Sequence, residues 1–410
     1  MEDLRKNEIY EAEIVGYSSD GSGVCRINGR AVFVPRTIVC KALFGSEDAI
    51  PMWVADMDVK TAPEITEALT KRAMHGIYGY TGVSDDDYNA VINWVRTRFG
   101  AEIRREWIGW GEGVVSSIYQ VVNALTRPGD RIVIQTPVYT PFYNAIRDTG
   151  REIRSNPLIN NDNYYTMDFD DLETAFRGGA RMMILCSPHN PIGRVWTYDE
   201  ISRVVELCRK YDVVLISDEI HSGFIYKDHK QTTVMGFDYN NTIVMISASK
   251  AFNLAGLGLS NMIIRREDYK KRIESMAHAA GAESGSNNVF GLIAQRTAYE
   301  KCGAWLDELT AYIESNADET MRRLVSEMPL IHCHKPEGTY LMWLDMSALG
   351  TAEEVFKALC KAGVGLNRGA DYGEKGQCDG YMRFNVACPR GQLDRALDAM
   401  VCAYKELTQA

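Results

Sequence analysis

Four apolar runs of strand length constrain the fold of this chain more than any other feature. They are RIVIQTP from Arg131, RMMILCSP from Arg181, VVLISDE from Val213 and TIVMISAS from Thr242. Continuous apolar runs are typical of parallel strands that are buried on both faces, and such sheets gather their chemistry at the carboxyl ends of the strands. Amphipathic helical patterns lie between the runs, and in TYDEISRVVELCRKY the residues Thr197 and Glu200 form a capping box. The pattern predicts an α/β domain built on a mostly parallel sheet.

The same patterns divide the chain into three parts. Residues 1–42 contain short strand-like runs around Asn28-Gly29, a two-residue hairpin turn, and predict a β-rich segment. Residues 43–300 hold the strand, loop and helix repeats of a large α/β domain. A long helical pattern then leads into a smaller α+β domain over residues 301–410.

Composition and charge exclude several kinds of partner. A formal net charge of −10 argues against a nucleic acid or an anionic membrane as the main partner. No apolar stretch approaches the ~20 residues of a membrane span, and the N-terminal MEDLRKNEIYEAE lacks the apolar core of a signal peptide. The ten cysteines include no C-x-x-C pair, which favours reduced thiols. We therefore expect a cytoplasmic protein that binds neither nucleic acid nor membrane.

One short run, His332-Cys333-His334, resembles a set of metal ligands. Adjacent residues on a strand face opposite ways, however, and no second pair of ligands lies nearby in the sequence. We expect a surface strand or loop end here and no metal site.

Two glycine- and proline-rich loops offer groups for binding a ligand. In GWGEGVVSSIY, Gly111 and Gly113 precede a helical pattern that begins near Val115, and the N–H groups at such a helix start bind anions such as phosphate. In TPVYTPFY, Tyr139 lies between two prolines, where a rigid ring can stack on a flat ligand. Taken alone, the first loop is more often a plain turn and the second a loop anchor.

Two further loops follow predicted strands. Asn190, in CSPHNPIGRVW, can donate a hydrogen bond to a ligand oxygen, although Asn-Pro is also a common turn. In LISDEIHSGFIY, Asp218 and Glu219 follow four apolar residues, so at least one carboxylate is drawn into the interior, with His221 three residues after Asp218. A buried carboxylate needs a cationic or hydrogen-bonding partner, and a structural salt bridge is the simplest alternative.

The run IVMISASKAFNLAGLGLSN places Lys250 just beyond the end of a buried strand. A desolvated lysine must be neutralised, paired or used covalently. A phosphate site, a stacking ring, a hydrogen-bonding amide, a buried carboxylate and a lysine together match the needs of pyridoxal 5′-phosphate (PLP). The cofactor aldehyde requires the amine, the pyridine nitrogen an anion, the phenolic oxygen donors and the phosphate N–H groups. The combination predicts PLP as the cofactor.

On these motifs the chain resembles the fold-type I PLP enzymes. More narrowly it is similar to the cystathionine β-lyases and cysteine-S-conjugate lyases of the MalY/PatB type, within the class I/II aminotransferase superfamily. The likeness runs from about Lys41 to the C-terminus and rests on PMWVADMDVKTAPEI, GIYGYTG, PVYTPF, SPHNPIGRVW, DEIHS, SASKAFNLAGL and MRFNVACPR. It implies the aspartate aminotransferase-like fold, a small amino-acid substrate and a homodimer with a shared active site.

The resemblance also implies roles for the residues around the cofactor ring. Lys250 would bind the cofactor aldehyde as an imine and later act as a base. Asp218 would pair with the pyridinium nitrogen, and Tyr139 would stack on the ring, which completes the implied catalytic set. Asn190 would bind the phenolic oxygen, with His221 beside it where related enzymes often carry a tyrosine.

Further residues are implied in binding the phosphate and the substrate. The phosphate would be held by Gly113, Val114, Val115, Ser247 and Ser249. Arg383, in MRFNVACPR, would bind the substrate α-carboxylate, which suits a planar guanidinium, and Asn190 would be a second substrate-binding residue. Tyr80 would reach the phosphate of the second subunit. Many aminotransferases carry an arginine where this chain has Gly258, so part of the phosphate charge must be met otherwise.

The resemblance implies a carbon–sulfur β-lyase that converts cystathionine or other L-cysteine S-conjugates to a thiol, pyruvate and ammonia by α,β-elimination. The alternative is a class I/II aminotransferase of an amino acid, because the same groups serve both reactions up to the carbanion.

Residues 1–42 resemble the start of a TRAM-type module, a small β-barrel associated with RNA binding. Six basic and six acidic residues balance in this segment, so the sequence offers no basic footprint for RNA. A non-catalytic RNA-binding or regulatory protein is a further alternative, supported by this segment alone.

Overall fold

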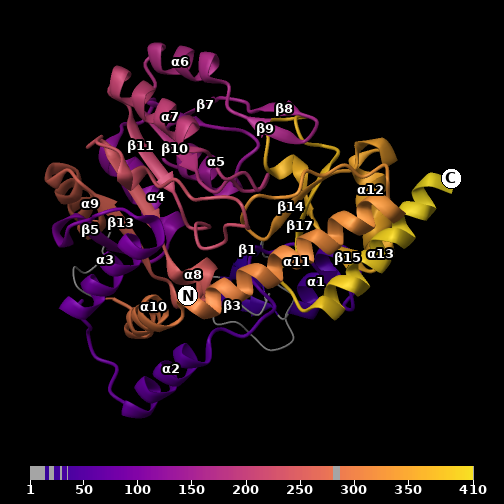
Figure 1. The fold of residues 1–410 in the computed structure, drawn as a ribbon, viewed down its shortest axis with the longest axis horizontal. Helices are drawn as coiled ribbons and strands as arrows, with labels where there is room; N and C mark the ends of the chain where they lie inside the picture. The colour runs from indigo at the N-terminus through magenta and orange to yellow at the C-terminus, as the bar shows by residue number, and fades with distance from the viewer. Residues whose placement is uncertain (1–13, 18–22, 28–29, 35, 280–286, 410) are drawn as a thin grey trace.

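A seven-stranded sheet forms the centre of the large domain in the computed structural model, which describes residues 14–17, 23–27, 30–34, 36–279 and 287–409 (Figure 1). In chain order its strands are β5 (Ile108–Gly111), β6 (Arg131–Ile134), β7 (Glu152–Ser155), β10 (Met182–Cys186), β11 (Val214–Asp218), β12 (Thr242–Ile246) and β13 (Ser260–Ile264). Across the sheet they follow the order β5-β13-β12-β11-β10-β6-β7. The four predicted apolar runs are four adjacent strands of this sheet, β12, β11, β10 and β6.

Strands β12, β11, β10, β6 and β7 pair in parallel, whereas β13 is antiparallel to both of its neighbours. Cys186 of β10 is opposite Asp218 of β11, and Asp218 is opposite Met245 of β12. This register brings the carboxyl ends of three strands to one edge of the sheet. The predicted mostly parallel α/β fold is confirmed.

Helices cover both faces of the sheet, and alternate residues of each strand enter two separate cores. On β10, Met182 and Ile184 belong to one core, and Met183 and Leu185 to the other. The first core is covered by α4 (Val114–Leu125), α5 (Thr140–Arg147) and α9 (Glu267–Ala279). The second is covered by α2 (Pro63–His75), α3 (Asp85–Phe99), α6 (Phe169–Arg177), α7 (Tyr198–Tyr211) and α10 (Val289–Lys301). Two covered faces explain why the strands are apolar throughout.

Helix α7 begins at the predicted capping box. The Thr197 hydroxyl accepts a hydrogen bond from Glu200 N at 3.2 Å, and the Glu200 carboxylate accepts one from Thr197 N at 2.8 Å. These bonds satisfy backbone donors that a helix start otherwise leaves unpaired.

The C-terminal domain contains an antiparallel sheet and three helices. Its sheet consists of β14 (Leu341–Asp345), β17 (Tyr381–Asn385) and β16 (Asn367–Arg368), and its helices are α11 (Gly303–Glu327), α12 (Ala352–Lys361) and α13 (Arg390–Gln409). The long helix α11 is the one predicted after residue 301, and it crosses the molecule beside α13 (Figure 1). Strand β4 (Ile50–Pro51), within the predicted large domain, pairs in parallel with β15 (Val364–Gly365) of the C-terminal part. The division at residues 42 and 300 otherwise stays a prediction.

The N-terminal segment contains β1 (Ile14–Tyr17), β2 (Gly23–Ile27) and β3 (Arg30–Val34), which form a three-stranded antiparallel sheet. The predicted turn at Asn28-Gly29 lies outside the described residues, but Ile27 and Arg30 on either side of it are paired. Helix α1 (Arg36–Phe44) follows and was not predicted. A short hairpin of β8 (Ile159–Asn161) and β9 (Tyr164–Thr166) lies at the edge of the large domain.

Candidate active site

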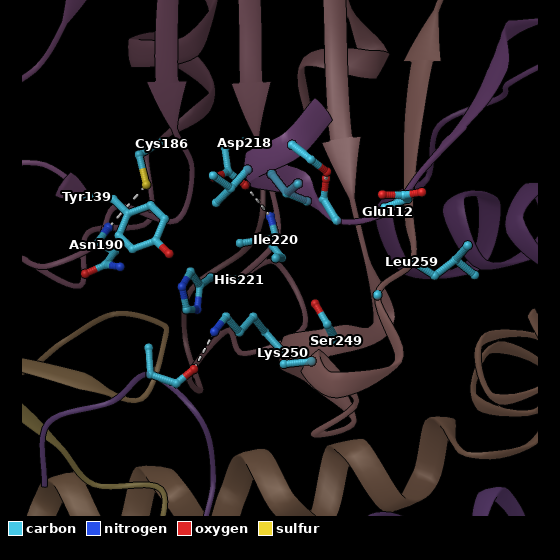
Figure 2. A pocket seen from close by; sticks show the side chains of 17 residues that line it. Glu112, Tyr139, Cys186, Asn190, Asp218, Ile220, His221, Ser249, Lys250 and Leu259 are labelled. Atoms are coloured by element: carbon cyan, nitrogen blue, oxygen red, sulfur yellow. Dashed lines mark hydrogen bonds between the residues drawn. The ribbon is translucent and has the colours of Figure 1, made fainter. Parts of the chain in front are cut away.

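A pocket of about 340 Å³ lies at the carboxyl ends of β10, β11 and β12 (Figure 2). Ligand sites in proteins commonly have volumes of about 300–1,000 Å³. Nine of the predicted site residues line it: Gly113, Val114, Val115, Tyr139, Asn190, Asp218, His221, Ser249 and Lys250. Loops that are far apart in the sequence therefore meet in one cavity, as expected for the loops that follow neighbouring parallel strands.

Lys250 comes from the short helix α8 (Ala248–Ala251), and its side chain extends into the pocket, where the amine donates a hydrogen bond to the backbone oxygen of Ala55 (Figure 2). Burial lowers the pKa of Lys250 to about 8, and the positive charge of Arg383 adds to this effect, while Asp56 and Asp218 oppose it. An appreciable fraction of the amine is therefore neutral near pH 7, and only the neutral amine is a nucleophile or a base.

Asp218 is the last residue of β11, and its Oδ1 accepts a hydrogen bond from Ile220 N at 3.1 Å. Burial raises the pKa of Asp218 to about 7, although the positive charge of Lys250 opposes the shift. Such a carboxylate is stabilised by a cation placed beside it, and a protonated pyridine nitrogen meets that need.

Asn190, His221 and Tyr139 occupy the part of the pocket near the ends of β10 and β11 (Figure 2). The side chain of His221 is buried and its Nδ1 has no hydrogen-bond partner. Burial, with the charges of Lys250 and Arg383, lowers the pKa of His221 well below its usual range, so the imidazole is neutral. Asn190 Oδ1 accepts a hydrogen bond from Arg383 Nη1 at 3.2 Å. A neutral imidazole and an amide can donate to a phenolic oxygen without adding charge.

The opposite end of the pocket is formed by the start of α4. Gly113, the N-cap residue, has a φ of 142° and makes no side-chain cap, so the first-turn N–H groups stay available to an anion. Gly258 lines the same end with a φ of 49°, and a Cβ added there would lie 3.2 Å from Glu112 O. Backbone groups and the Ser249 hydroxyl therefore approach this end closely, which fits a phosphate group.

Three predicted site residues lie outside this set. Ser247 is buried, and its Oγ donates to Leu259 O at 2.7 Å and accepts from Ser249 N at 3.0 Å. Arg383, on β17, donates a hydrogen bond to Asn190, which lines the pocket. The guanidinium carbon of Arg383 lies 5.1 Å from the centre of the Tyr372 ring. Tyr80 is exposed, with 88% of its surface accessible.

The groups that line this pocket fit the parts of PLP. They are an amine, a buried carboxylate, a neutral imidazole whose Nδ1 has no hydrogen-bond partner, and a helix start without a side-chain cap. The family model described as Aminotransferase class I and II matches residues 48–400, most of the chain. The chain belongs to the class I and II aminotransferase family. Its cofactor is PLP, as the sequence predicted.

Several curated relatives of this family member are named as cystathionine beta-lyases, and others as aminotransferases. Cystathionine beta-lyase PatB of Bacillus subtilis (strain 168) is 42% identical over 87% of this chain and 92% of its own length. Protein MalY of Escherichia coli (strain K12) is 31% identical over 88% of this chain and 93% of its own length. The predicted resemblance to the MalY/PatB group is confirmed. The TRAM-type resemblance of residues 1–42 gains no support from these matches.

Solved structures with the same fold also hold the cofactor. Cystalysin from Treponema denticola, which contains pyridoxal 5′-phosphate, has a TM-score of 0.86 and 32% identity and covers 90% of this chain and 95% of its own. The PLP-bound C-S lyase from Staphylococcus hominis has a TM-score of 0.81 and 31% identity and covers 88% and 92%. Both likenesses confirm the aspartate aminotransferase-like fold for this aminotransferase-family chain.

The sequence did not predict that the motif PMWVADMDV forms part of the pocket wall. Ala55 lines the pocket, and its backbone oxygen accepts from Lys250 and, at 2.9 Å, from the buried hydroxyl of Tyr340. Segment 54–59 is bound by two asparagines. Asn253, just after α8, donates to two of its carbonyls at 2.8 and 2.9 Å, and Asn385, at the end of β17, donates to two others at 2.6 and 2.7 Å. The motif PMWVADMDV indicated the family resemblance, but it gave none of its residues a role in the site.

No metal site was expected at His332-Cys333-His334. Among the described residues there is no group of three or more His, Cys, Asp or Glu side chains that could hold a metal ion. His334 Nδ1 instead lies 2.9 Å from Lys335 O. No helix in the described part of the chain is both long and apolar enough to span a membrane.

Proposed function

We propose that this chain is a PLP-dependent carbon–sulfur β-lyase that cleaves cystathionine or other L-cysteine S-conjugates into a thiol, pyruvate and ammonia. One observation carries the proposal: an amine whose pKa is lowered to about 8, that of Lys250, shares a pocket with the buried carboxylate of Asp218. The names of the relatives, cystathionine beta-lyase and C-S lyase, support the choice of reaction.

In the proposed reaction, bound PLP withdraws electrons from the substrate and so stabilises negative charge at Cα. Arg383 binds the α-carboxylate; its Nε has no hydrogen-bond partner, so the guanidinium retains a donor for the substrate. The Lys250 amine would remove the Cα proton, the thiolate would leave from Cβ, and water would hydrolyse the resulting aminoacrylate to pyruvate and ammonia. Each acid–base step of this kind typically raises the reaction rate about 10²–10⁴-fold.

Asp218 keeps the pyridine nitrogen protonated in this scheme, and Tyr139 supports the ring. Asn190 and His221 donate to the phenolic oxygen, and the first turn of α4, from Gly113 to Val115, binds the phosphate together with Ser249. Ser247 acts through Ser249, whose backbone N–H it accepts at 3.0 Å.

The competing proposal is an aminotransferase, which uses the same residues as far as the carbanion and then requires a keto-acid co-substrate. The deciding experiment incubates the PLP-loaded enzyme with L-cystathionine in the presence and absence of 2-oxoglutarate and measures pyruvate. A lyase releases pyruvate in both samples. Pyruvate that depends on 2-oxoglutarate would reject the lyase, and so would its absence from both samples when an S-alkyl-L-cysteine also yields none.

We further propose that the enzyme is a cytoplasmic homodimer in which Tyr80 completes the active site of the second subunit. Support comes from a group of exposed apolar side chains in the last turn of α2 and just after it, namely Met74, Ile77, Tyr78 and Tyr80, with 57–88% of their surfaces accessible. Apolar patches of this kind are typical of interfaces. Sedimentation equilibrium of the wild type and of Tyr80→Ser tests the proposal: a monomeric wild type would contradict it.

A further inference from the structure

Two neighbouring segments hold the guanidinium of Arg383. Its Nη2 donates to Trp53 O at 2.7 Å and to Asn367 Oδ1 at 2.8 Å. Trp53 follows β4, and Asn367 begins β16 just beyond β15. Strands β4 and β15 are paired, and Met52 N donates to Gly365 O at 2.9 Å. The two acceptors therefore keep their spacing only while these two segments stay together.

The ring of Phe44, the last residue of α1, lies against both segments. It meets the Trp53 ring edge to face, with 5.6 Å between centroids and an interplanar angle of 81°. It also occupies the space in front of Gly365, where an added Cβ would lie only 2.4–2.6 Å from three ring carbons of Phe44. Phe44 is 5% exposed. One apolar side chain thus fills the space beside both segments that present acceptors to Arg383.

We propose that Phe44 is a positioning residue for recognition of the substrate α-carboxylate. Its ring keeps Trp53 and the β15–β16 segment at the spacing that aims Arg383 at the substrate. This inference rests on the role proposed for Arg383, and it adds α1, which precedes the family match at residues 48–400, to the substrate site. A planar guanidinium binds a carboxylate through two parallel hydrogen bonds, and displacements of a fraction of an ångström weaken such a pair.

The test compares two probes that differ only in the α-carboxylate: L-methionine, which has no leaving group at Cβ, and 3-(methylthio)propylamine. Each is titrated into PLP-loaded wild type and Phe44→Ala, and the dissociation constant is read from the cofactor absorbance. We expect the Kd for methionine to rise about tenfold in the variant, the loss typical of a weakened charged hydrogen bond. The Kd for the amine should stay within about twofold, because it does not use Arg383.

Phe356→Leu is the matched control, because the Phe356 ring of α12 packs on Phe44 at 6.2 Å and 50° and its centroid lies 3.8 Å from the guanidinium carbon of Arg368 on β16. A leucine keeps apolar packing at this position and leaves Phe44 against Trp53 and Gly365. It should change neither Kd by more than about twofold. If Phe44→Ala does not fold, Phe44→Leu should raise the Kd for methionine alone by about threefold.

An unchanged ratio of the two Kd values in a folded Phe44 variant, or an equal change in Phe356→Leu, would overturn the inference. It would also fall if the wild type bound methionine no better than the amine, since Arg383 would then not bind the carboxylate. A wild type that prefers methionine but releases no pyruvate from cystathionine or an S-alkyl-L-cysteine would reject the lyase alone, and Phe44 would still be judged by the ratio.

Discussion

The pKa of Lys250 gives a prediction that can be measured before any cofactor is added. At a pKa of about 8, about one Lys250 amine in ten is neutral at neutral pH, against fewer than about one in a thousand for a lysine at its ordinary pKa of about 10.4. Acylation by acetic anhydride requires the neutral amine. Lys250 in the cofactor-free protein should therefore be acylated with a midpoint near pH 8.

The assay labels the protein across a pH series with a trace of the reagent and quantifies each lysine by peptide mass spectrometry. Lys271 is an internal control, because its exposed amine contacts Glu267 at 2.6 Å and its pKa is raised, so its midpoint lies above that of an ordinary lysine. Two variants test which charged groups shift the pKa of Lys250. Arg383→Leu should raise the Lys250 midpoint, because a cation that lowers the pKa is removed, whereas Asp218→Asn should lower it. A Lys250 midpoint near that of Lys271 would refute the reasoning.

Three further predictions concern residues around the site. Burial raises the pKa of Glu219 to about 7, above that of an unfolded glutamate, so the free energy of unfolding falls as the pH rises towards 7. Glu219→Gln should therefore reduce the drop in melting temperature between about pH 5.5 and pH 8.5. A drop equal to that of the wild type would contradict this. Thr140 Oγ1 donates to Asp371 O at 2.8 Å between the domains. Thr140→Val removes this bond and should lower kcat/KM roughly two- to tenfold, whereas Thr140→Ser keeps the hydroxyl and should keep kcat/KM. Equal kcat/KM values for the two variants would exclude a role for the hydroxyl. Arg194, 3% exposed, donates to Glu337 at 2.9 Å, so Arg194→Met should cost about 3–5 kcal/mol. The melting temperature in calorimetry should fall by roughly 3–6 °C, with partial recovery in the double variant with Glu337→Met.

The strands that carry the site were predictable because they are buried on both faces. A continuous apolar run leaves few alternatives, and parallel pairing then brings Asp218 and the loop before Lys250 to one edge. Strand β7 was not predicted: it is at the sheet edge, and Glu152 is exposed, so its apolar signal is weak. Strand β13 is buried along its whole length like β12, and burial does not distinguish its antiparallel direction.

The parts of the site made by backbone were the hardest to foresee. Lys250 and Tyr340 both bind the carbonyl of Ala55, a group that every residue carries, so no side chain in PMWVADMDV marks the contact. The position of Arg383 was found through its motif, but its holders Trp53 and Asn367 were not, because the three lie far apart in the sequence and meet only through strand pairing.

The two asparagines that bind segment 54–59 join this stretch to two parts of the molecule. Asn253 belongs to the large domain and Asn385 to the small one, and between them they use four carbonyl groups of the same short stretch. Each hydrogen bond contributes about 1 kcal/mol, and the stretch can stay with only one asparagine if the two separate, so separation breaks two of the four bonds and costs roughly 2 kcal/mol. Segment 54–59, which carries Ala55 of the pocket wall, is therefore held from two sides, by the end of β17 and by the loop after α8.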